Sequence, residues 1–95
     1  RAVALACARD TIRVNSISPG SIRTRLLEYS ASQLAGDGKT VEDMIGVFGE
    51  SHPVGRVGTT AETSSLIAYL CSDAASFITG TDLRIDGGLT AQLSV

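Results

Sequence analysis

The stretch Ile12-Arg-Val-Asn-Ser-Ile-Ser-Pro-Gly-Ser-Ile-Arg-Thr24 decides the fold, because it predicts a strand that runs into a sharp turn and then into a helix. Its first half is rich in β-branched residues, which suit a pleated and largely buried surface, and predicts a strand over about residues 12 to 18. Pro19 cannot donate to a ladder, and Gly20 permits a close approach that a Cβ forbids. The strand should therefore end there, and Thr24 should cap the helix that follows.

This strand end is a candidate wall of a ligand site. In an open α/β sheet, small ligands bind in the crevice beyond the carboxyl ends of the strands. A strand that ends in Pro19-Gly20 and opens onto a helix capped by Thr24 fits that position. An ordinary strand-to-helix turn has the same pattern, and spacing alone does not separate the two interpretations.

The remaining elements predict an α/β fold. A strand, then helices, then a strand is the order of a right-handed crossover between parallel strands. Two parallel strands do not make a stable sheet alone, because parallel sheets are buried on both faces, so we expect this chain to be a fragment of a larger sheet. The expected elements are a helix end over residues 1–9, a helix from Thr24 to the break at residues 36–38, a helix capped by Thr40, an extended connector over 53–58, a helix from the capping box at 59–62 to about Ser72, and a strand centred on 83–85 that ends at Gly87-Gly88.

Composition excludes several classes of function. The net charge is −2 and no basic run occurs, so nucleic-acid and anionic-membrane binding have no electrostatic footprint. No apolar run approaches the roughly 18 residues of a spanning helix. We interpret Cys7 and Cys71 as buried free thiols, and His52 as structural or solvated, so no metal site is predicted. A hydrophobic content of 43% and a start at Arg1 in mid-helix again indicate a fragment whose apolar surface other sequence or partner subunits cover.

Three blocks of the chain, in this order, resemble the short-chain dehydrogenase/reductase family of single-domain Rossmann enzymes that use NAD or NADP. The first is Ile12-Arg-Val-Asn-Ser-Ile-Ser-Pro-Gly20 with Ile22 and Thr24. The second is Pro53-Val-Gly-Arg-Val-Gly58 with Glu62, and the third is Phe77-Ile-Thr-Gly80 through Asp86-Gly-Gly88. The resemblance covers nearly the whole chain. It implies that residues 1–95 are the C-terminal part of a doubly wound parallel-sheet Rossmann domain: helix end, strand, two lid helices, helix and edge strand.

The resemblance implies a cofactor role for four residues. Pro19 and Gly20 would line the nicotinamide end of the cofactor site. The backbone of Ile22 would meet the nicotinamide carboxamide, whose amide and carbonyl a peptide unit can pair with. The hydroxyl of Thr24, at a helix N-terminus, would bond the carboxamide or the pyrophosphate.

The resemblance also implies a substrate lid and a subunit interface. The lid would span residues 25–52 and close over a small alcohol or carbonyl substrate, although plain core packing of these helices is the competing interpretation. The segment from about Thr59 to Asp86 usually packs against a second subunit in this family, which implies a homodimer or homotetramer. The candidate substrate-wall residues are Leu26, Leu27, Met44 and Phe48.

Two family motifs are absent from this sequence. It holds no Gly-x-x-x-Gly-x-Gly turn and no Tyr-x-x-x-Lys pair, since Tyr29 and Tyr69 are followed four residues later by Gln33 and Asp73. No residue of this chain is therefore assigned as catalytic, and the 95 residues alone should be inactive. The connection at Asp10-Thr11 is also shorter than the family usually has.

These departures leave an alternative open: a truncated or decayed relative that acts only through protein–protein contacts. The sequence does not choose between NAD and NADP and does not name the substrate. The cytoplasm is the default compartment for a reduced chain without a signal peptide.

Overall fold

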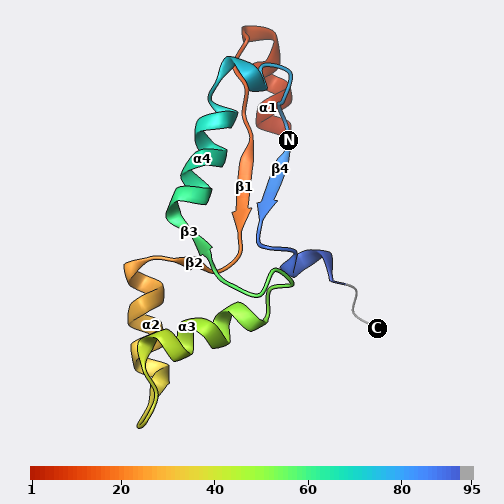
Figure 1. The fold of residues 1–95 in the computed structure, drawn as a ribbon. Coiled ribbons are helices and arrows are strands. Elements are labelled where there is room, and N and C mark those ends of the chain that lie inside the picture. The colour runs from red at the N-terminus through yellow and green to blue at the C-terminus, as the bar shows by residue number, and fades with distance from the viewer. Residues whose placement is uncertain (93–95) are drawn as a thin grey trace.

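The computed structural model describes residues 1–92 and forms the predicted helices and strands in the predicted order, with two short strands, β2 and β3, in addition (Figure 1). Its extents are 57 × 34 × 21 Å. The helices are α1 Ala2–Cys7, α2 Arg25–Ala35, α3 Val41–Glu50 and α4 Thr60–Leu70, and the strands are β1 Ser16–Pro19, β2 Ile22–Arg23, β3 Gly58–Thr59 and β4 Asp82–Ile85. Short 3-10 turns cover Ala8–Asp10, Asp73–Ala75 and Leu89–Ala91.

The predicted parallel crossover is confirmed. Strands β1 and β4 pair in parallel, with Ser16 opposite Asp82 and Pro19 opposite Ile85. The amide of Gly20 extends the ladder by donating to the Ile85 carbonyl at 3.0 Å. Peptide groups alternate in direction along a strand, so the nitrogen of Pro19 lies toward the opposite edge, where its missing proton costs this ladder nothing.

The first strand is shorter at its start than predicted. Instead of residues 12 to 18, the ladder covers Ser16–Pro19, because side chains take over the bonding of the preceding residues. The Val14 amide donates to the Thr79 hydroxyl at 3.1 Å. The Asn15 side chain donates to the Ile78 carbonyl at 2.9 Å and accepts from the Thr81 amide at 3.1 Å. These bonds fasten the segment to the loop before β4 without a regular ladder.

All three predicted helix caps are confirmed. The hydroxyl of Thr24 accepts from the Leu27 amide at 3.2 Å. Thr40 and Asp43 form a reciprocal capping box at the start of α3, and Thr59 and Glu62 form another at the start of α4. Each box satisfies two amides that a helix N-terminus otherwise leaves without partners, so local sequence alone fixes these starts.

The prediction of an extended connector over residues 53–58 is wrong. The segment folds into turns, with Gly55 at φ 84° and its amide donating to the His52 carbonyl at 2.7 Å. It then enters β3, which pairs in parallel with β2 through Ile22 opposite Gly58. The connector folds because it packs against two glycine-bearing turns: the Val54 amide donates to the Gly87 carbonyl on one side, and His52 reaches the turn after β1 on the other.

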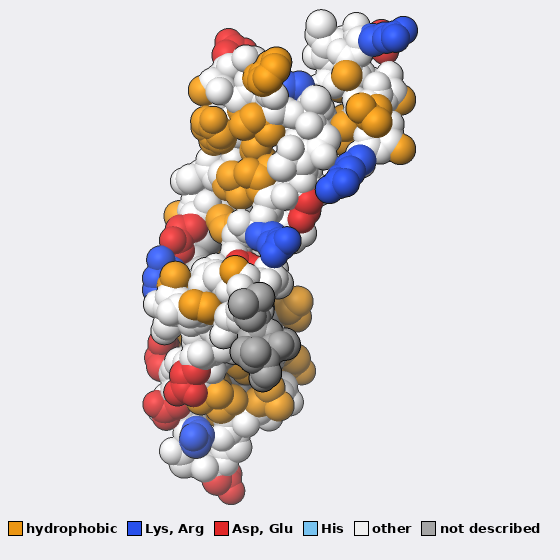
Figure 2. Space-filling view, turned by 90° about the vertical axis from the view of Figure 1, so that its right-hand side faces the viewer, with side chains coloured by type: hydrophobic (Ala, Val, Ile, Leu, Met, Phe, Trp, Pro, Cys, Tyr) orange, Lys and Arg blue, Asp and Glu red, His pale blue; other side chains and the backbone are white. Residues whose placement is uncertain are grey.

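The described part of the chain encloses little apolar volume. One cluster joins Ala31, Ile45 and Val57 between α2, α3 and the start of β3, whereas Leu5 is 78% exposed and Phe77 is completely exposed. Figure 2 shows hydrophobic side chains gathered over the upper half of the face that it draws, the half that holds α1, β1, β4 and α4 in Figure 1. An open groove of about 500 Å³ also separates β1 from α4, lined in part by Val14, Ile17, Ile67 and Leu70.

Both cysteines are free, as predicted, but neither is fully buried. Cys7 is partly covered, and Cys71, beside the open groove, is exposed. The prediction of a buried thiol at Cys71 is therefore wrong for this chain taken by itself. No helix in the described range 1–92 is long and apolar enough to cross a membrane.

The exposed apolar surface predicts how the chain behaves alone. We expect the 95-residue chain to keep helical circular dichroism but to unfold without a sharp thermal transition and to bind a hydrophobic dye such as ANS, since its apolar groups lack cover. Thermal scans and dye titrations at low protein concentration would measure both. A sharp, concentration-independent transition with no dye binding would contradict the expectation.

Candidate functional site

The residues predicted to meet the cofactor lie together at the carboxyl end of β1. Pro19, Ile22 and Thr24 line one side of a shallow hollow of about 320 Å³. Gly20 lies just beyond the ladder, held by its bond to Ile85. The other side of the hollow comes from hydroxyl-bearing residues of α4: Thr60, Thr63 and Ser64.

Thr63 is one of the residues that line this hollow. Its hydroxyl oxygen is buried, yet it has no hydrogen-bond partner among the described residues. Buried polar atoms are normally paired, and an unpaired one costs free energy. Because this oxygen has almost no accessible surface, a group placed in the hollow would meet the apolar walls from Pro19 and Ile22 rather than the Thr63 hydroxyl.

The Ser21 peptide is held on two sides by the connector. Its amide donates to Nε2 of His52 at 3.1 Å, and its carbonyl accepts from the Gly58 amide at 2.9 Å. Because peptide groups of successive strand residues face opposite edges, the amide and carbonyl of Ile22 face away from β3. That leaves one donor and one acceptor of Ile22 side by side on an open edge, the arrangement that pairs with a carboxamide.

His52 holds this turn with a defined tautomer. Its side chain is 3% exposed, and its Nδ1 lies 3.1 Å from the Phe48 carbonyl near the end of α3. A carbonyl only accepts, so Nδ1 carries the proton and donates, which leaves Nε2 as the acceptor for Ser21. The structural role predicted for His52 is confirmed, and the alternative of a solvated side chain is wrong.

Position 20 requires glycine, because neighbouring segments lie too close for a side chain there. A Cβ placed on it would lie 2.9 Å from Nε2 of His52 and 3.0 Å from the Asp86 Cα. The side chain of Asp86 is itself engaged, accepting from the Thr90 hydroxyl and amide and from the Gly88 amide, and these bonds lower its pKa. The turn after β1 is therefore packed directly against the turn after β4.

An ion-pair network joins β2 to the starts of both predicted lid helices. The guanidinium of Arg23 bonds Glu28 in the first turn of α2 at 3.2 Å, and also bonds Glu42 in the first turn of α3. The bonds to Glu42 and Glu28 raise the pKa of Arg23, and Arg23 lowers the pKa of Glu42. These groups are partly exposed, so the network fixes geometry more than it adds stability.

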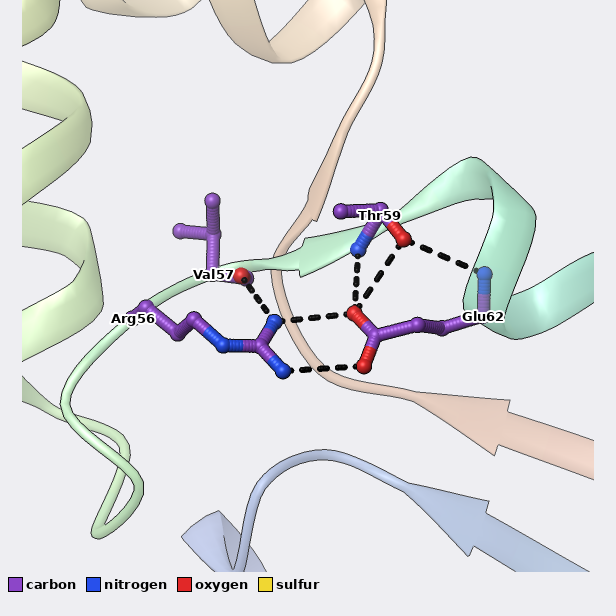
Figure 3. Close-up of polar contacts among 4 residues, drawn as sticks. All are labelled: Arg56, Val57, Thr59 and Glu62. Carbon is purple, nitrogen blue, oxygen red and sulfur yellow. Dashed lines mark hydrogen bonds and ion pairs between the residues drawn. The ribbon is translucent and has the colours of Figure 1, made fainter.

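A second ion pair, shown in Figure 3, fixes the start of α4 behind the hollow. Arg56 bonds both oxygens of Glu62 at 2.8 and 2.9 Å and donates to the Val57 carbonyl at 3.1 Å. The same carboxylate accepts from the Thr59 amide at 2.9 Å. Arg56, and then the Thr59 amide, lower the pKa of Glu62 to about 2.

The candidate substrate-wall residues divide into two groups. Leu27, Met44 and Phe48 are partly buried and pack against the cluster of Ala31, Ile45 and Val57 that holds α2 and α3 together. Leu26 is 74% exposed. Three of the four thus contribute to packing between the two helices, and Leu26 alone among them has a largely free side chain.

The sequence predictions named Ser21, His52 and Arg56 without the contacts that they make here. The contact of His52 with Ser21 accompanies the pairing of β2 with β3, two strands of two residues each, and Arg56 bonds Glu62 at the start of α4. No group of three or more His, Cys, Asp or Glu side chains within residues 1–92 could hold a metal ion.

Comparison with known proteins places this site in a family. Residues 1–90 match the family model described as enoyl-(acyl carrier protein) reductase. The chain is 40% identical over 90 residues to the short-chain dehydrogenase/reductase bsc3 of Alternaria brassicicola, a match that covers 95% of this chain and 31% of that protein. The chain thus spans about a third of the length of the curated relatives it matches.

Two similar solved structures contain nicotinamide cofactors. A 4-hydroxyisoleucine dehydrogenase complexed with NADH has a TM-score of 0.76 and 40% identity, over 97% of this chain and 35% of that one. L-Sorbose reductase from Gluconobacter frateurii, complexed with NADPH and L-sorbose, has a TM-score of 0.89 and 29% identity, over 97% of this chain and 36% of that one.

The Glu62 cluster predicts a pH dependence. Folding lowers the pKa of Glu62 from 4.5 to about 2, so the carboxylate stabilises the start of α4 fully above pH 4.5, and this contribution is lost as the pH falls from 4.5 to about 2. A carbon-13 titration of the Glu62 carboxyl should give a pKa far below the ordinary value. Arg56→Gln should raise it, though not to 4.5, because the Thr59 amide still donates. A carboxyl that titrates at its ordinary value in the unsubstituted protein would contradict the assignment.

Proposed function

The chain belongs to the short-chain dehydrogenase/reductase family, and we propose that it supplies the nicotinamide pocket, the substrate lid and a subunit interface of an oxidoreductase that interconverts an alcohol and a carbonyl. The members of the family that resemble it include complexes with NADH and with NADPH, so the cofactor class is NAD or NADP. The observation that carries the proposal is the open edge of Ile22 beside Pro19 and Thr24.

The hollow fits a nicotinamide with its carboxamide. Pro19 and the side chain of Ile22 offer apolar contact to a ring, while the outward-facing amide and carbonyl of Ile22 match the carbonyl and amide of a carboxamide. The nicotinamide, when bound, accepts or gives the hydride, and the role of these residues is to fix which face and which edge of the ring they present.

The hydroxyl of Thr24 can still donate a hydrogen bond to the cofactor. Its oxygen already accepts from the Leu27 amide in capping α2, but a hydroxyl also carries one proton to donate. That proton is directed to a carboxamide or pyrophosphate oxygen, in a position where the helix N-terminus favours negative charge. Thr24 therefore combines a structural cap with a cofactor contact.

Residues 25–52 form the substrate lid in this proposal. The two helices pack on each other through their own small cluster, and Arg23 ties both N-termini to β2, directly after the Ile22 contact. The pair can therefore move as one unit about its attachment to β2. The exposed side chain of Leu26, in the first turn of α2, is the most available of the four wall candidates for a substrate contact.

The proton-transfer residues lie outside this chain in the same proposal. The sequence of 95 residues has no Tyr-x-x-x-Lys pair, and the family mechanism assigns the general acid/base to that Tyr. The exposed apolar side chains of α4 and of the segment after it, among them Ile67, Tyr69 and Phe77, support a homodimeric or homotetrameric interface. A reducing compartment such as the cytoplasm agrees with the two free thiols.

The experiment that tests the function uses the full-length protein encoded by the transcript that contains this chain. We expect it to bind NAD(H) or NADP(H) and to oxidise or reduce members of a panel of alcohols and carbonyls, with the absorbance of the reduced nicotinamide as the measurement. A full-length protein that is folded and binds neither cofactor would contradict the proposal and would favour the non-catalytic relative that acts through protein contacts.

Substitution of Thr24 tests the cofactor contact separately. Thr24→Val removes the hydroxyl at nearly constant volume and should weaken cofactor binding by about tenfold, the usual worth of one hydrogen bond together with some loss from the helix cap. Thr24→Ser keeps the hydroxyl and should bind within about threefold of the unsubstituted protein, since only a methyl group is lost. Equal binding by Thr24→Val and Thr24→Ser, measured by fluorescence titration, would remove Thr24 from the cofactor site.

A further inference from the structure

The segment between α3 and β3 meets the candidate cofactor turn through one buried side chain. His52 is 3% exposed, and it is the one residue of residues 1–92 that is both polar and buried in this way. Its Nε2 accepts from the Ser21 amide at 3.1 Å, across 31 residues of sequence. Neither the sequence motifs nor the comparisons assign any role to this position.

We propose that His52 is a positioning residue of the cofactor site, which holds the Ser21 peptide so that the amide and carbonyl of Ile22 face the nicotinamide carboxamide. This inference rests on the proposed function of the Pro19–Thr24 turn. It goes beyond that function because it explains what sets the orientation of the turn.

The orientation depends on two bonds to one residue. The Gly58 amide holds the Ser21 carbonyl at 2.9 Å, and His52 holds the Ser21 amide. The amide and the carbonyl of Ser21 are thus both bonded on the connector side. Because peptide groups of successive strand residues face opposite edges, the amide and the carbonyl of Ile22 face the open edge. Loss of the His52 bond leaves the Ser21 amide unpaired and leaves the Gly58 bond alone to resist rotation of the turn.

The imidazole is itself held in place from the far side. Its Nδ1 donates to the Phe48 carbonyl at 3.1 Å, and the Ser51 hydroxyl donates to the same carbonyl at 2.9 Å. Phe48 lies in the last turn of α3, where carbonyls lack helical partners. His52 thus connects the end of the second lid helix to the cofactor turn through its two ring nitrogens.

The His52 side chain lies close to the turns after β1 and β4. A Cβ on Gly20 would lie 2.9 Å from Nε2, and a Cβ on Gly87 would lie 3.6 Å from the His52 Cβ. His52 thus lies between the two turns, beside a cavity of about 150 Å³ that it lines together with Asp86 and Gly87.

The test compares two ligands that differ in the nicotinamide alone. In the full-length protein, His52→Leu should weaken binding of NADH or NADPH, whichever the protein prefers, by about tenfold, because one orienting hydrogen bond is lost. Binding of the matching ADP-ribose, with its 2′-phosphate where NADPH is preferred, should change by less than about twofold, because that ligand has no carboxamide for Ile22 to meet. Isothermal titration calorimetry measures both affinities.

Conservative variants separate the acceptor from the shape of the ring. His52→Gln places an oxygen at about the reach of Nε2 and should restore the preference for the nicotinamide ligand, whereas His52→Asn is one bond shorter and should resemble His52→Leu. Ile45→Ala, which opens a cavity in the cluster between α2 and α3, is the matched control for lost stability. It should leave the ratio of the two affinities unchanged.

Hydrogen exchange gives a readout that does not depend on cofactor. The peptide that contains Ser21 should exchange faster in His52→Leu and His52→Asn than in the unsubstituted protein, and should stay protected in His52→Gln. If His52→Leu weakens both ligands equally, or neither, the positioning role is overturned. If the unsubstituted protein binds neither ligand although Ser21 is protected, the proposed function fails, and the positioning role falls with it.

Discussion

The arrangement of this molecule depends on the two-sided hold on the Ser21 peptide. A strand end by itself does not orient the residues after it, because beyond Pro19 the ladder with β4 stops. The connector supplies the missing constraint, with His52 on the amide and Gly58 on the carbonyl. These bonds place residues 52–58, which follow α3, against the turn that precedes α2. The segment over residues 25–52 is thereby closed at its base, and the end of α3 is tied to the turn through His52.

Glycine makes that closure sterically feasible. The connector passes between the turns after β1 and β4, and a Cβ on Gly20 or Gly87 would lie within 3.0 Å of atoms in neighbouring segments. At Gly49 a Cβ would lie 2.8 Å from the Arg56 Cα, where α3 ends against the connector. Gly20, Gly49 and Gly87 therefore mark places where a neighbouring segment comes too close for a side chain, and Gly87 also sits where the chain turns with positive φ.

The sequence correctly predicted those elements that are fixed by contacts between near neighbours in the chain. Thr24, Thr40 and Thr59 cap helices through bonds to residues three positions away, so a short window contains everything that fixes each start. The β1–β4 pairing followed from the order of elements and chain handedness. The connector was predicted wrongly because its turns depend on partners about 30 or more residues away. No periodicity in residues 53–58 reports that Val54 bonds Gly87.

The same reasoning explains what was missed at the site. A single histidine with no acid, cysteine or serine pattern around it indicates no chemistry, and here it performs none: its two nitrogens bond a backbone amide and a backbone carbonyl. Its importance comes from where those backbone groups lie. A buried imidazole with a fixed tautomer connects the end of α3 to the turn after β1 with two hydrogen bonds. In the proposed function, the geometry of the cofactor site is set partly by side chains that never touch the cofactor, and these follow from strand pairing rather than from motif.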